Sequence, residues 1–161
     1  MKVLVLFLLS IVTLFAGSYH FNEKRYVYSV DKTIEMQGKI TFDDKGMQID
    51  YTMPEVRHIV YDGLSMEIIN VNDEVVQHID LNEQPMMKVY LDFIHKLYRG
   101  DYEALSENFK VQKTQTVIIL TPIAPVDKVV TSVLVHQTPK GLQQITTEMS
   151  NGDKITLHIT Q

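Results

Sequence analysis

Histidine, serine and carboxylate side chains are the groups in this chain that could do chemistry, and their spacing matches no catalytic motif. The six histidines are scattered, and no two of them are four residues apart with a carboxylate between, as a helical zinc site requires. Ser65 lies in GLSME, which lacks the second glycine of a nucleophile elbow. The chain has no cysteine. We therefore expect no catalytic residue, no metal site and no cofactor.

The remaining chemical motifs are equally weak. Asp43 and Asp44 are adjacent, and adjacent side chains on a strand point to opposite faces, so this pair is expected in a turn. No two glycines lie close enough to form a phosphate-binding loop. The net charge of -5 argues against a nucleic-acid partner, because phosphate contacts need a basic surface. An enzyme acting on lipid or glycan stays a hypothesis, with Ser65 or His58 as its candidates.

Apolar side chains form the clearer pattern. In MQIDYTM, four residues share one face of a predicted strand, namely Met47, Ile49, Tyr51 and Met53. The chain has eight methionines and no tryptophan, and methionine adapts to varied apolar partners. This face could pack in a core or could line a cavity.

These side chains must be positioned by a β-rich fold. The predicted strands cover residues 24–30, 38–42, 47–53, 56–61, 65–70 and 75–81, followed by 109–113, 116–121, 129–136, 142–149 and 154–159. Turn residues between them, such as Asn151-Gly152, favour antiparallel hairpins. Between the two groups, apolar residues from Pro85 recur at helical spacing up to Gly100, and Asp101 can cap a short second helix. The order predicts one curved antiparallel sheet around a helical insert.

The N-terminal segment has the layout of a secretory leader. Lys2 precedes an apolar run that ends at Ala16, and small residues follow. We expect cleavage after Ser18, which makes residues 1–18 a signal peptide and residues 19–161 one domain. An uncleaved membrane anchor is the alternative, although the apolar run is short for a membrane span.

Short motifs follow one another in a characteristic order along the chain. FNEK (Phe21–Lys24) begins a strand, and GKITF comes next. MQIDYTMP ends in Thr-x-Pro, RHIVYDG ends in Asp-Gly, and PMMKVYLDFI and LTP follow. This order resembles that of the LolA family of periplasmic outer-membrane lipoprotein carriers, whose strands and helix carry similar motifs. The resemblance covers most of the chain after the leader.

This resemblance implies a fold and a role. The fold is an unclosed antiparallel β-barrel with helices as a lid over its concave apolar side. The role is a monomeric periplasmic carrier that takes acylated lipoproteins or other envelope lipids from an inner-membrane transporter to an outer-membrane acceptor. Lys45 occupies the position of a family arginine that latches the lid, and lysine provides a point charge in place of a planar fork. The family's helix before the first strand has no counterpart between residues 18 and 21. Either the cavity is less covered, or a retained leader takes the place of that helix, or the true start lies upstream.

The resemblance and the alternating face together give a predicted lipid-binding cavity. Its residues are Ile40, Phe42, Met47, Ile49, Tyr51, Met53, Met86, Val89, Tyr90 and Phe93, with Lys45 as the lid latch. A second hypothesis is an envelope sensor or adaptor on the same fold that binds a protein partner or another lipid. The missing first helix and the lysine at position 45 motivate it.

Overall fold

The computed structural model describes residues 17–72 and 74–160, which form one antiparallel sheet and two helices. The predicted leader lies outside the described residues except for Gly17 and Ser18, so its cleavage stays a prediction. The strands are β1 (Ser18–Val27), β2 (Lys32–Phe42), β3 (Met47–Met53), β4 (Arg57–Tyr61), β5 (Ser65–Asn70), β6 (Val75–Asp80), β7 (Phe109–Lys113), β8 (Val117–Pro122), β9 (Val130–Thr138), β10 (Gly141–Met149) and β11 (Lys154–Thr160).

The eleven strands that the structure describes lie in the order β6-β5-β4-β3-β2-β1-β11-β10-β9-β8-β7. Consecutive strands pair as hairpins on both sides, and β1 pairs with β11 in the middle of the sheet. β6 and β7 are the two free edges, so the sheet does not close into a barrel. The predicted fold class, a single antiparallel sheet with a helical insert, is confirmed.

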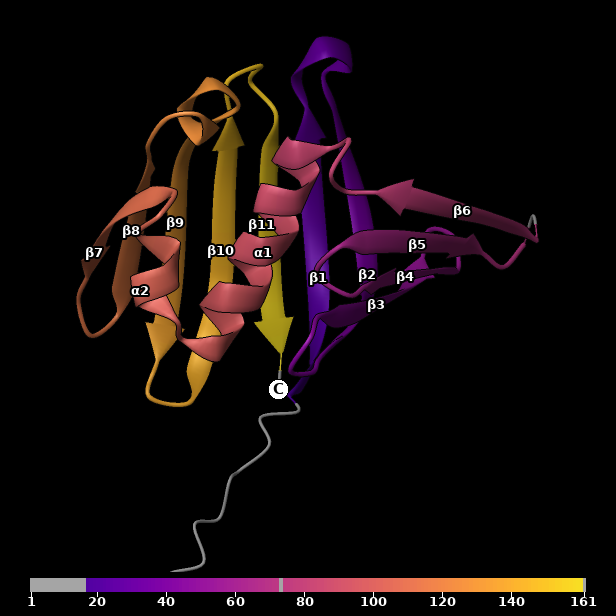
Figure 1. The fold of residues 1–161 in the computed structure, drawn as a ribbon, viewed down its shortest axis with the longest axis horizontal. Helices are drawn as coiled ribbons and strands as arrows, with labels where there is room; N and C mark the ends of the chain where they lie inside the picture. The colour runs from indigo at the N-terminus through magenta and orange to yellow at the C-terminus, as the bar shows by residue number, and fades with distance from the viewer. Residues whose placement is uncertain (1–16, 73, 161) are drawn as a thin grey trace, which may run out of the picture.

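The longer helix, α1 (Pro85–Arg99), crosses one face of this sheet in front of β11 and β1 (Figure 1). It begins at a proline, which suits a first helical turn, and it ends at Gly100 in the left-handed conformation. Both halves of the sheet reach it: Tyr61 of β4 donates a hydrogen bond to Asp92, and Phe109 of β7 packs against Phe93. The sheet therefore curves around α1.

The second helix, α2 (Tyr102–Leu105), is a single turn that leads towards β7. The Asp101 side chain caps it by accepting a hydrogen bond from the amide of Ala104 at 3.1 Å, as the sequence predicts. A membrane-spanning helix is not found among the described residues.

The turn between β2 and β3 illustrates how local chemistry sets the strand register. One carboxylate oxygen of Asp43 accepts hydrogen bonds from the amides of Lys45 and Gly46, at 2.8 Å and 2.7 Å. These amides lower the pKa of the Asp43 carboxyl below its usual range. A Cβ atom at Gly46 would lie 1.8 Å from the carbonyl oxygen of Tyr61, so only glycine lets β3 and β4 approach this closely.

The first strand differs from its prediction. It begins at Ser18 and ends at Val27, whereas the sequence predicts a strand over residues 24–30. Residues 28–30 form a 3₁₀ turn, because the amide of Tyr28 donates to the Asp153 carboxylate at 2.9 Å and Asp31 adopts a left-handed conformation. The early start arises from pairing with β2 and β11 on both sides, which composition alone does not reveal.

Candidate functional site

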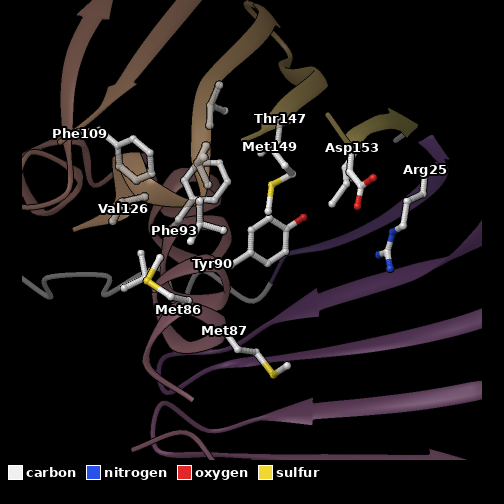
Figure 2. Close-up of a pocket in the computed structure, with 15 residues that line it drawn as sticks. Arg25, Met86, Met87, Tyr90, Phe93, Phe109, Val126, Thr147, Met149 and Asp153 are labelled. Atoms are coloured by element: carbon white, nitrogen blue, oxygen red, sulfur yellow. The ribbon is translucent and has the colours of Figure 1, made fainter. Parts of the chain in front are cut away.

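The N-terminal half of α1 covers an apolar cavity of about 350 Å³ (Figure 2). The cavity lies between this helix and the β7–β11 half of the sheet. Its lining is Met86, Met87, Val89, Tyr90 and Phe93 of α1, Phe109 of β7, Val126 and Val129 before β9, Val130 and Val133 of β9, Thr147 and Met149 of β10, Asp153 and Ile155 around the start of β11, and Arg25 of β1. All of these except Arg25, Thr147 and Asp153 are apolar or aromatic.

The four helix residues of the predicted cavity all line this space. Met86, Val89, Tyr90 and Phe93 follow one another along the face of α1 that is turned to the sheet. Their helical spacing already indicated a shared face, and the structure shows that this face lies over a hollow as well as over packed side chains.

The predicted strand residues occupy a different place. Ile40, Met47, Ile49 and Tyr51 line a smaller hollow of about 60 Å³ on the β2–β3 side of α1, where Tyr90 lies at the boundary with the larger cavity. The alternating face of β3 thus meets the helix, as its period-2 pattern predicts, but it packs there more closely than the β9–β11 side does. Its role in binding stays a prediction.

Two further predicted residues lie outside both hollows. Phe42 is buried and stacks on Tyr98 of α1, with ring centroids 4.3 Å apart. Met53, at the end of β3, has 43% of its surface exposed. Phe42 therefore serves first to hold the C-terminal half of the helix on the sheet.

Sequence reasoning missed the part of the lining that comes from β9 to β11. Val130 and Val133 on β9, together with Thr147 and Met149 on β10, face α1 from the opposite side to β3. The sequence predicts their strands, but Val130 and Val133 lie three residues apart, so simple alternation does not mark them as one face. That β11 pairs with β1, and so brings these strands under the helix, is a long-range feature that no local pattern contains.

A polar cluster lies between the two hollows, and in it the Glu23 carboxylate is buried while the Arg25 side chain is 43% exposed. Glu23 is only 5% exposed, and its carboxylate accepts hydrogen bonds from Arg25 Nη2 at 2.7 Å and from the Tyr51 hydroxyl at 3.2 Å. Burial and the adjacent carboxylate raise the pKa of the Tyr51 hydroxyl above its ordinary value, so it remains a donor. Burial likewise raises the pKa of Tyr90. The inward positions of Glu23 and Arg25 follow from the early start of β1, which the sequence-based strand boundaries concealed.

The helix is fastened to the sheet mainly through its C-terminal half. His95 Nε2 donates to the carbonyl oxygen of Asp43 at 3.0 Å, and Arg99 Nη1 donates to that of Asp44 at 3.3 Å. With Tyr61 and Asp92, these are the polar contacts that we find between α1 and the sheet within the described residues, and all begin at Asp92 or later. The helix residues before Asp92 rest on apolar contacts beside the cavity.

The predicted latch residue, Lys45, lies in the same β2–β3 turn. Its backbone amide takes part in the Asp43 turn, while the side chains that reach across from α1 to this turn are those of His95 and Arg99. The hydrogen bonds at this turn therefore go from side chains of α1 to backbone carbonyl oxygens of the turn. A role for the Lys45 ammonium stays a prediction.

This asymmetry predicts uneven hydrogen exchange along α1. Amides of residues 89–91 should exchange at least about tenfold faster than those of residues 96–98, because the second group sits where the helix is pinned. Exchange followed by mass spectrometry or NMR measures the ratio. Tyr61→Phe, which removes the hydrogen bond to Asp92, should speed exchange in the C-terminal half and serves as the control. Equal protection along the whole helix would contradict a helix that is fixed mainly at one end.

The residues with catalytic potential are distributed elsewhere. The Ser65 hydroxyl donates to Asp62 at 3.1 Å inside a hairpin turn, and His58 contacts Asp50 at 2.7 Å on β4 and β3. Among the residues that the structure describes, no group of three or more His, Cys, Asp or Glu side chains could hold a metal ion. The arrangement around α1 is suited to sheltering an apolar group from water.

Comparisons with known proteins give likenesses of structure. The chain is similar to a LolA superfamily protein from Nitrosomonas europaea, with 12% identity and a TM-score of 0.45, over 91% of this chain and 84% of that one. It is also similar to a domain described as an outer membrane lipoprotein-sorting protein from Vibrio parahaemolyticus, with 10% identity and a TM-score of 0.40, over 90% and 84% of the two chains. No family model matches the sequence, and neither does any curated protein.

Proposed function

We propose that this protein is a carrier that shelters the acyl chains of a lipid or lipoprotein in the cavity under α1. The observation that supports this most is the apolar cavity itself, about 350 Å³ in volume, beneath the half of the helix that apolar contacts alone hold. Pockets of this size hold small ligands in other proteins. The protein would bind its ligand without changing it chemically.

The energetics of such a role are favourable. Each methylene group removed from water contributes about 0.8 kcal/mol, so an acyl chain does not leave a membrane for water without a protein to cover it. A carrier must also release its ligand, which requires that the cover opens at modest cost. A helix anchored by His95 and Arg99 at one end and by packing at the other can do this.

The finer proposal is transport across the periplasm. The predicted leader of residues 1–18 would export the chain, which would work as a monomer. There it would receive acylated lipoproteins or other envelope lipids from an inner-membrane transporter and pass them to an outer-membrane acceptor. The motif order of the sequence supports this route, and the apolar lining supports the kind of cargo.

Extraction of the protein with organic solvent tests the proposal. Protein purified from cells without detergent is extracted, and the extract and intact complexes are analysed by mass spectrometry. We expect bound acylated species, and we expect lipoproteins to pass from membranes to the delipidated protein. An extract without acyl chains, together with one stable protein partner after crosslinking in cells, would contradict the carrier and favour an adaptor.

A further inference from the structure

The larger cavity is apolar along most of its length and charged at one side. Figure 2 shows Arg25 and Asp153 on the side away from Phe109 and Val126, with the ring of Tyr90 between the two ends. A pure hydrocarbon ligand would gain nothing from a guanidinium group at this place. The charged side is therefore where a polar group attached to a hydrocarbon chain would lie.

The Arg25 guanidinium is only partly satisfied by the protein. Its Nη2 donates to the Glu23 carboxylate at 2.7 Å, which occupies one of the donor positions of the planar group. Its Nε is buried and has no hydrogen-bond partner among the described residues. The Arg25 side chain as a whole is 43% exposed and lines the cavity, so the guanidinium can also donate to a ligand oxygen there.

Two carboxylates accompany Arg25, which is the one lysine or arginine among the described residues that line the cavity. Glu23 is buried against Arg25, and Asp153 lies at the same side of the cavity, where its oxygens accept hydrogen bonds from the Tyr28 amide and the Asn151 side chain, both at 2.9 Å. With one positive and two negative groups, the local charge is negative. A ligand carboxylate would be repelled here, whereas a neutral carbonyl oxygen needs only the N–H donor.

We propose that Arg25 recognises the neutral carbonyl group of an acyl ester or acyl amide, and that Glu23 makes the site reject free fatty acids. The carbonyl oxygen accepts from the Arg25 guanidinium, and the hydrocarbon chain runs past Tyr90 towards Phe93 and Phe109. This inference rests on the proposed function, because it concerns the same cavity. It adds the ligand class, the orientation of the chain and the residues that set specificity.

Three probes with the same chain separate the possible ligands: palmitate, monopalmitoylglycerol and N-palmitoylglycinamide. The glycerol ester represents a membrane lipid and the amide represents an acylated protein terminus. Equilibrium dialysis against the delipidated full chain should show both neutral probes binding at least about tenfold more tightly than palmitate at neutral pH. The neutral probe that binds more tightly indicates whether the site fits a membrane lipid or an acylated protein terminus.

The Glu23→Gln variant provides the decisive change. It keeps the shape of the side chain and removes the negative charge, so palmitate should bind about tenfold more tightly while the neutral probes change by less than about twofold. The double variant Glu23→Gln/Arg25→Met removes the donor as well. Relative to Glu23→Gln, it should bind both neutral probes about tenfold less tightly, and circular dichroism checks that both variants are folded.

The outcomes separate this inference from the function on which it rests. If palmitate binds the unmodified protein as tightly as the neutral probes, or if Glu23→Gln leaves palmitate binding unchanged, the role of Glu23 is wrong while an acyl carrier stands. If the double variant keeps the affinity of Glu23→Gln for the neutral probes, the role of Arg25 is wrong and the carrier again stands. If none of the three probes binds the unmodified protein, the carrier itself is wrong and this specificity fails with it.

Discussion

Replacing Val130 by phenylalanine should lower the affinity for a neutral palmitoyl probe, monopalmitoylglycerol, at least about tenfold. Val130 lies on β9, is 7% exposed, and lines the larger cavity. A phenyl ring at this position would occupy space that the acyl chain needs. Excluding two methylene groups would forfeit about 1.6 kcal/mol, which is more than tenfold in the binding constant.

The same substitution should leave the protein folded. A ring that fills empty space adds apolar contacts, so the free energy of unfolding should change by less than about 1 kcal/mol. Urea denaturation measures stability, and fluorescence displacement measures the binding of the probe. Val60→Phe is the matched control: Val60 is 41% exposed and lies between Ile59 and Tyr61, which face the helix side, so it points to the outer face. Equal affinity of both variants for the probe would contradict the location of the site.

Replacing Phe42 by alanine should lower the free energy of unfolding by about 3–5 kcal/mol, the usual cost of removing a buried aromatic ring. Phe42 is 3% exposed, stacks on Tyr98, and packs edge-on against Tyr19 with centroids 6.1 Å apart. These rings hold the C-terminal half of α1 against β1 and β2. Phe42→Leu keeps most of the volume and should cost less than about 1.5 kcal/mol.

The affinity of folded Phe42→Ala for the palmitoyl probe should stay within about twofold of the unmodified protein. The reason is that Phe42 lines neither of the two hollows beside α1. Binding is measured at a temperature where urea titration shows the variant to be folded. Loss of binding by the stable Phe42→Leu variant would instead place Phe42 in the site, as the sequence pattern predicts.

The elements that could be predicted from the sequence are those with local causes. Pro85 and Gly100 bound a helix because their backbone preferences suit its two ends, and Asn151-Gly152 marks a hairpin because Gly152 needs a positive φ, here 88°. Asp101 can be predicted as a cap because its short side chain accepts a hydrogen bond from an amide three residues further along the chain. Such signals depend on a few neighbouring residues, so these elements can be predicted without knowledge of the whole fold.

The residues that α1 contributes to the candidate site could be predicted from the sequence for a similar reason. An amphipathic helix has one apolar face, and Tyr90 and Phe93 had to lie on it. What the helix face meets depends on the pairing of β1 with β11, which joins the two halves of the sheet. That pairing places β9 to β11 beside the cavity and leaves β3 more closely packed.

The polar cluster was missed because of one strand boundary. Composition predicts β1 only from residue 24, so the alternation of Phe21, Glu23 and Arg25 on one face is not visible from composition, although FNEK matches a first-strand motif. The structure extends β1 back to Ser18, and the alternation then places a carboxylate and a guanidinium under the helix. Tertiary pairing on both sides of the strand overrides the local preference of FNEK, which contains no β-branched residue.

Photo-crosslinking with a palmitoyl probe that carries a diazirine along its chain tests the central claim most directly. The label should be found by peptide mass spectrometry on Tyr90, Phe93 and Met149, and Val130→Phe should reduce it at least about tenfold. Two results would contradict an acyl-binding cavity under α1. One is label concentrated on the outer face around Val60. The other is label that persists when an excess of the probe without diazirine is added as a competitor.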